Sequence, residues 1–127
     1  MGRVVLGVIV GYAVWTALWL GGNLGLQQAF AEAYEAFVAG EPITEIGYLG
    51  GALVLSVVCS FFAGLLTAKL AGDGASRAVW IMASLLLLTG IGVQVGAWDR
   101  MPVWYHLTFL ILLIPVCLVG ARGQTAN

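Results

Sequence analysis

The chain has 127 residues, of which 61% are hydrophobic and 9% are charged, and its formal net charge is −1. Soluble domains carry about 25% charged residues, so this composition excludes a water-facing globular surface and predicts an integral membrane protein. The near-neutral charge offers no basic stripe for phosphates, so nucleic acid is excluded as a partner. The two cysteines, Cys59 and Cys117, match neither a disulfide framework nor a zinc motif, and we expect no cofactor and no metal.

The first apolar stretch, residues 4–24, carries no charge. A membrane-spanning helix needs about 20 apolar residues, and the run is too long for a signal peptide, so we expect a retained membrane helix. Small residues recur at four-residue spacing in two sets, which favours close approach of a neighbouring helix. The first set is Gly7 and Gly11, and the second is Ala17, Gly21 and Gly25.

Residues 27–39 have the pattern of a short amphipathic helix. Phe30 and Phe37 fall on one face of such a helix, whereas Glu32 and Glu35 fall on the opposite face. We expect this segment to lie outside the cytoplasm, either in the membrane interface or as an extension of the first helix. The pattern leaves open whether its apolar face contacts lipid or another protein.

The second apolar stretch, residues 46–70, predicts a helix with one face free of bulky side chains. Residues four apart in a helix lie almost above one another, and here every fourth residue is small. The predicted helix-packing stripe consists of Ala52, Ser56, Ser60, Gly64, Ala68 and Gly72. We expect this helix to be central, with its stripe packed against the first or the third spanning helix.

Two more apolar stretches, residues 78–97 and 102–121, are the third and fourth predicted membrane spans. Ser76 is a plausible N-cap for the third span, and Pro115 lies deep in the fourth, where it predicts a kink. Continuous apolar runs favour helices over a barrel. The sequence therefore predicts an all-α polytopic membrane protein in one domain, residues 1–127, with four transmembrane helices in an antiparallel bundle and a short extracytoplasmic amphipathic helix.

Basic residues predict the orientation of this bundle. If four helices alternate in direction, Arg3, Lys69, Arg77 and Arg122 fall on one side, and only Arg100 falls on the other. The positive-inside rule then places both termini in the cytoplasm. We expect a multi-pass protein of the cell inner (plasma) membrane, whose partners are the lipid bilayer and other transmembrane helices.

A few polar residues inside the spans are candidates for chemistry. Gln94 is the most polar side chain in any span, and either bonds to a neighbouring helix or contributes, with Thr89 and Ser60, to a polar path. His106 is the only histidine, and with Asp99 it is a candidate proton or metal site. The alternative for His106 is a hydrogen-bonded interfacial histidine.

Three features of the sequence are shared with a known group. Residues 63–71 close the second span, a Pro-x-Trp-aromatic element at residues 102–105 opens the fourth, and Pro115 precedes a final Gly-Ala-Arg at residues 120–122. In these features the chain resembles small bacterial inner-membrane proteins that have no assigned activity. The resemblance implies a four-helix membrane architecture and leaves the function open.

The function expected from these observations is non-enzymatic. Abundant small-residue stripes with almost no charge in the spans favour a protein that acts through helix–helix packing, as an accessory subunit of a membrane complex or as a homo-oligomer. The alternative is a small transporter or channel with a polar path near Gln94. An enzyme is the least supported class, because no nucleophile–base set or phosphate-binding loop can be assembled.

Overall fold

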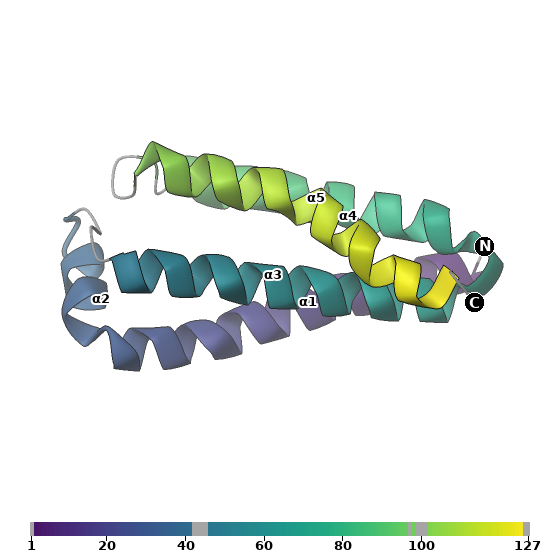
Figure 1. Ribbon diagram of the computed structural model, residues 1–127, viewed down its shortest axis with the longest axis horizontal. Coiled ribbons are helices and arrows are strands. Elements are labelled where there is room, and N and C mark those ends of the chain that lie inside the picture. The colour runs from purple at the N-terminus through teal and green to yellow at the C-terminus, as the bar shows by residue number, and fades with distance from the viewer. Residues whose placement is uncertain (1, 42–45, 97, 99–101, 126–127) are drawn as a thin grey trace.

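The computed structural model describes residues 2–41, 46–96, 98 and 102–125, and nearly all of these residues are helical (Figure 1). The prediction of an all-α protein is therefore confirmed for the described residues. The elements are the helices α1 (Gly2–Ala29), α2 (Ala31–Val38), α3 (Ile46–Ala71), α4 (Ala75–Gly96) and α5 (Val103–Thr125), with a 3-10 turn η1 (Gly72–Gly74) between α3 and α4.

Three helical segments of the described chain are long and apolar enough to cross a membrane: Gly2–Ala29, Ile46–Gly96 and Val103–Arg122. The second segment has 51 residues because it comprises α3, η1 and α4, which follow one another directly along the chain. A helix satisfies its own backbone hydrogen bonds, which is the requirement that hydrocarbon imposes on a spanning segment.

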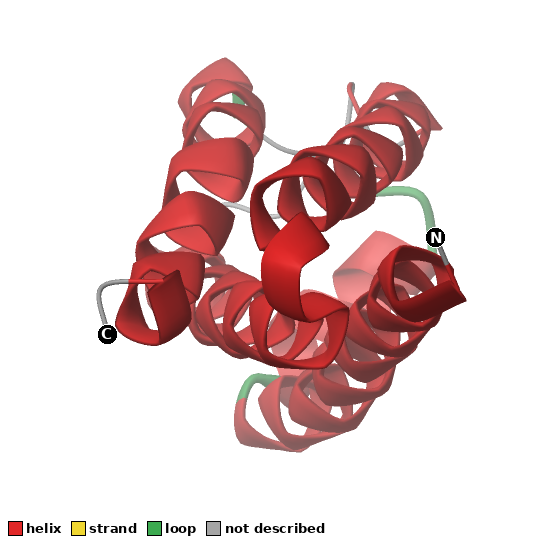
Figure 2. Cartoon of the chain, turned by 90° about the vertical axis from the view of Figure 1, so that its right-hand side faces the viewer, coloured by secondary structure: helices red, strands yellow, loops and turns green. Residues whose placement is uncertain are grey.

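The long helices lie side by side and alternate in direction (Figures 1 and 2). Both termini lie at the end of the molecule where α3 passes through η1 into α4, and α2 lies at the opposite end (Figure 1). The helix α3 packs most extensively on α1 and on α5, while α4 packs on α1, α3 and α5. The second apolar stretch of the sequence is therefore the central helix.

The segment predicted as one amphipathic helix over residues 27–39 is divided in the structure. Residues 27–29 belong to α1, and the separate helix α2 begins at Ala31. It ends in a Schellman motif, in which Glu41 N–H donates to the Ala36 carbonyl at 2.8 Å and Gly40 N–H donates to the Phe37 carbonyl at 3.0 Å. Gly40 has a φ of +90°, which glycine adopts without steric cost.

The apolar face of α2 lies on this chain. Phe30, Ala33 and Phe37 pack against a buried cluster that contains Tyr48 and Tyr105. The rings of Phe30 and Tyr48 meet edge to face, with centroids 6.2 Å apart. The apolar side of α2 therefore contacts this chain's own buried cluster, while no residue of α2 itself is fully buried.

The turn between α3 and α4 depends on glycine and not on a serine cap. Gly72 has a φ of +62°, a left-handed conformation that lets the chain leave α3 after Ala71. The 3-10 turn then continues directly into α4 at Ala75, so Ser76 lies inside the first turn of α4. The expected N-cap at Ser76 is therefore wrong.

The helix α5 continues through Pro115. Proline in a helix interior lacks the N–H that would bond to the carbonyl one turn earlier. Figure 1 shows that α5 changes direction in its middle, consistent with the predicted kink. The bend brings its second half across α3, where the two helices approach most closely.

Candidate functional site

The predicted small-residue stripe of α3 lies in the interior of the molecule. Its members Ala52, Ser56, Ser60, Gly64 and Ala68 are buried, and Gly72 is half-buried. Because the stripe faces the other helices of the same chain, it is not available as a surface for another protein.

Two glycines bring α3 and α5 into backbone contact at two levels. A Cβ atom at Gly64 would lie 2.8 Å from the carbonyl carbon of Cys117, and closer still to the carbonyl oxygen. Reciprocally, a Cβ atom at Gly120 would lie 2.9 Å from the carbonyl carbon of Phe61. Each glycine therefore faces the backbone of the other helix, and neither position has room for a side chain.

The first small-residue set of α1 packs against α3 at Thr67. A Cβ atom at Gly7 would lie 2.8 Å from the Thr67 carbonyl oxygen, and a Cβ at Gly11 would clash with the Thr67 hydroxyl. That buried hydroxyl donates a hydrogen bond to the Gly7 carbonyl at 3.1 Å. Above this level, Trp15 Nε1–H donates to Ser60 Oγ at 3.0 Å. Close packing and hydrogen bonds therefore act together between α1 and α3.

The second small-residue set of α1 has no such neighbour. Ala17, Gly21 and Gly25 are exposed, and a Cβ atom at Gly21 or Gly25 would meet nothing within 4 Å. The sequence gives the two sets of α1 the same spacing. The structure separates them into a set that is packed within the chain and a set that is open.

His106 is the centre of a buried polar cluster at the end of the molecule that carries α2. Its side chain is fully buried, Nδ1 lies within hydrogen-bonding distance of Gln94 Oε1, and Nε2 lies 3.2 Å from the Trp98 carbonyl oxygen. The imidazole also stacks on the Trp98 ring, with centroids 4.5 Å apart and an interplanar angle of 10°. The cluster connects α4 to the first turn of α5.

The hydrogen bonding of His106 has two chemically consistent arrangements. The Trp98 carbonyl only accepts, so Nε2 carries a proton. In the neutral imidazole Nδ1 is then an acceptor, and the Gln94 amide must present its NH₂ group to it. In the imidazolium Nδ1 is a donor, and Gln94 presents its oxygen. A half-turn of one amide therefore satisfies either protonation state.

The proposed partner of His106, Asp99, lies outside the described residues. Within the described part of the chain, no group of three His, Cys, Asp or Glu side chains is placed to hold a metal ion. The contacts that His106 makes there are with an amide, a backbone carbonyl and aromatic rings.

The three residues of the predicted polar path bond to different partners. Gln94 contacts His106, and Ser60 accepts from Trp15. Thr89 Oγ1 lies 2.6 Å from the Tyr12 hydroxyl and donates to the Leu85 carbonyl at 2.9 Å. The structure therefore distributes them over three separate helix contacts.

The sequence points to Gln94 and to His106 separately, and the contact between them appears only in the structure. Gln94 lies near the end of α4 and His106 lies near the start of α5. In two consecutive antiparallel helices, residues at similar distances from the connecting segment lie at the same level, and this is the signal that predicts their contact. No family model, no curated protein and no solved structure matches the chain. The functional argument therefore depends on this chain's own geometry.

Proposed function

We propose that this chain is a non-enzymatic integral membrane protein that binds another transmembrane helix through the open small-residue set of α1. The observation that carries this proposal is the contrast between the two sets of α1. Gly7 and Gly11 are packed on α3, whereas Gly21 and Gly25 have the same spacing and open space beside them. The partner is a second copy of the chain or a larger subunit to which it is an accessory.

The second half of α1 has the shape that membrane helix pairs use. The open set spans Ala17 to Gly25, which is about 12 Å along the helix axis. Leu18, Leu20 and Leu24 beside it are 39%, 61% and 60% exposed and form ridges around the small residues. Without a hydrophobic driving force in lipid, helices associate by such close van der Waals packing.

The degree of burial also favours α1 as the binding helix. In the most apolar 18-residue part of α1, 17% of the residues are buried, compared with 39% and 33% in the other two apolar segments. The residues of α1 that are buried, Val4, Gly7, Gly11 and Trp15, all lie in its first half. Its second half is therefore covered less by the rest of the chain than its first half.

The proposed setting is the bacterial inner membrane, crossed by α1, α3, α4 and α5. Arg3, Lys69, Arg77 and Arg122 lie toward the end of the fold that holds both termini, and the glutamates of α2 lie at the other end. The positive-inside rule then orients both termini toward the cytoplasm and α2 toward the outside.

The test is the mass of the native assembly in mild detergent. We expect the wild-type chain to be recovered as a complex, and Gly21→Leu and Gly25→Leu each to shift it to the free chain. Gly92→Leu is the matched control, because Gly92 on α4 is also exposed with nothing within 4 Å of its added Cβ. Unchanged complexes in both α1 variants would overturn the proposal.

The transport alternative lacks an equivalent observation. Gln94, Thr89 and Ser60 each bond to a different partner and line no common path between described residues. Its direct test is solute flux into liposomes that contain only this protein, measured beside Gln94→Leu.

A further inference from the structure

We propose that the groove between α1 and α4 binds one anionic phospholipid, whose phosphate is held by Arg77 at the end that carries the termini. This inference requires that the chain is embedded in a membrane, as proposed above. It concerns the first half of α1, residues 8–13, whereas the open small-residue set lies farther along the helix, from Ala17 to Gly25.

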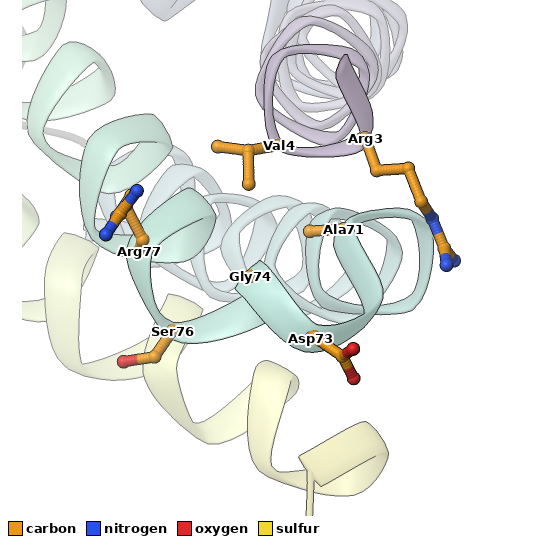
Figure 3. Close-up of a pocket in the computed structure, with 7 residues that line it drawn as sticks. All are labelled: Arg3, Val4, Ala71, Asp73, Gly74, Ser76 and Arg77. Carbon is orange, nitrogen blue, oxygen red and sulfur yellow. The ribbon is translucent and has the colours of Figure 1, made fainter. Parts of the chain in front are cut away.

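The polar part of the site is a cavity of about 690 Å³ at the start of α1 and α4 (Figure 3). It is lined by two guanidinium groups and one carboxylate, those of Arg3, Arg77 and Asp73, so its formal charge is positive. Figure 3 shows the two arginines on opposite sides of Val4. Neither guanidinium forms an ion pair with another residue that the structure describes, and a phosphate accepts hydrogen bonds from such a group with favourable charge.

The two arginines have different freedom. Arg3 Nε–H donates to the Leu70 carbonyl at 3.0 Å, which holds this side chain over the end of α3. Arg77 is exposed and points away from α3 at the α4 side of the cavity (Figure 3). Arg77 is therefore the group that meets a headgroup at the α1–α4 groove, and Arg3 contributes positive potential from across it.

The apolar part of the site is a second cavity, of about 390 Å³, farther along the same two helices. It is lined by Val8, Ile9, Tyr12, Ala13, Leu85 and Thr89. The Thr89 hydroxyl already donates to the Leu85 carbonyl, so the Tyr12 hydroxyl is the donor in the 2.6 Å contact between them. Both hydroxyl protons are thus engaged, and the groove presents a hydrocarbon-like surface.

The distance between the two cavities matches a phospholipid in one leaflet. Arg77, Ile81, Leu85 and Thr89 are four apart and form one row on α4. Leu85 follows Arg77 by eight residues, or about 12 Å, and the hydrocarbon half of one leaflet is about 15 Å deep. With Arg77 at the headgroups, the apolar cavity therefore lies at the depth of the acyl chains.

The same row argues against a protein helix as the occupant. Ile81 and Leu85 are each 42% exposed, and Leu85 lines the groove. A helix that packs closely on another needs small residues at the contact, and this row carries bulky ones. A flexible acyl chain fits between such side chains without close backbone approach.

The test is lipid retention by the purified full-length chain, measured as intact mass in mild detergent. Phosphatidylglycerol and phosphatidylcholine with identical acyl chains are the two probes. We expect one phosphatidylglycerol to be retained in preference to phosphatidylcholine. Arg77→Gln should weaken its retention about tenfold, the loss expected for a charged hydrogen bond. Arg122→Gln, an exposed arginine on α5 at the same end, is the control and should have no effect.

A second variant tests the acyl-chain part independently. Ala13 is exposed and lines the groove, so Ala13→Phe should fill it and lower phosphatidylglycerol retention. Ala29→Phe is the matched control at the far, exposed end of α1. Equal retention of both lipids would overturn the charge recognition. Displacement of the lipid by inorganic phosphate, with no effect of Ala13→Phe, would reduce the site to an anion site. Loss of the complex in Gly21→Leu is a separate result, so each proposal can fail alone.

Discussion

The close contact between α3 and α5 predicts that Gly64→Ala, which adds a single methyl group, lowers the stability of the fold substantially. In Gly64→Ala the new Cβ would lie 2.8 Å from the Cys117 carbonyl carbon, whereas ordinary van der Waals contacts lie at 3.4–4 Å. The obstacle is helix backbone, which cannot rotate aside as a flexible side chain does. The two helices must therefore separate along their contact, and the same displacement loosens the reciprocal contact at Gly120.

The expected change in the free energy of unfolding of Gly64→Ala is the difference between two opposing effects. Overpacking a tight core costs about 1–3 kcal/mol, whereas replacing glycine by alanine in a helix interior favours the helix by roughly 0.5–1 kcal/mol. Because the added Cβ meets helix backbone, we place the packing cost at the upper end of its range. We therefore expect Gly64→Ala to lower the free energy of unfolding by about 2 kcal/mol.

The two free cysteines supply the assay. Cys59 and Cys117 are fully buried, so a fluorogenic maleimide reports unfolding as they become accessible. We expect a lower melting temperature for Gly64→Ala, confirmed by circular dichroism because Cys117 lies at the mutated contact. Gly92→Ala is the control, since an added Cβ there meets nothing within 4 Å. If the two variants melt at the same temperature, the close approach of α3 and α5 is refuted.

Three further predictions follow from the hydrogen bonds and the orientation. Trp15→Phe removes the donor to Ser60 and keeps the ring, so stability in thermal melts should fall by about 1 kcal/mol; an unchanged melting temperature would contradict this. Gln94→Leu leaves a nitrogen of His106 unpaired and should cost about 1–3 kcal/mol, and His106→Phe added to it should recover most of that loss; additive losses would show that the two are not coupled. Ser76→Cys should react with a membrane-impermeant maleimide only after cell lysis, and labelling of intact cells would reverse the orientation.

Helix number and helix packing differ in how far the sequence predicts them. Apolar runs locate the helical segments because a run of hydrophobic residues is a local property of the chain. The stripe at Ala52–Gly72 likewise predicts a face that admits a close neighbour. It does not say which neighbour, because a small residue has no side chain with which to select one. The identity of α5 as that neighbour depends on Gly120, whose role appears only when the two helices are in register.

The candidate sites, too, can be predicted from the sequence only in part. The two small-residue sets of α1 are equivalent in sequence, and only the course of α3 decides that Gly11 is covered and Gly21 is open. His106 and Gln94 were both recognisable as polar residues in apolar surroundings. Their pairing depends on where α4 ends and where α5 begins, because these two points decide which residues of the two helices lie at the same level. The groove between α1 and α4 depends on where Tyr12 meets Thr89, which no local pattern encodes.

The helix contacts of this chain differ in kind from one helix pair to the next. Between α1 and α3, close packing at Gly7 is joined to hydrogen bonds from Thr67 and Trp15. Between α3 and α5, backbones touch at two levels. By contrast, α4 meets α1 through the Tyr12–Thr89 hydroxyl pair, beside a cavity, and meets α5 through Gln94 and through Gly90, which faces the Phe109 side chain. In lipid, packing and hydrogen bonds replace hydrophobic burial as the forces between helices. The glycine contacts with a neighbouring backbone described above therefore all lie on α3, whereas the contacts named for α4 are made through side chains.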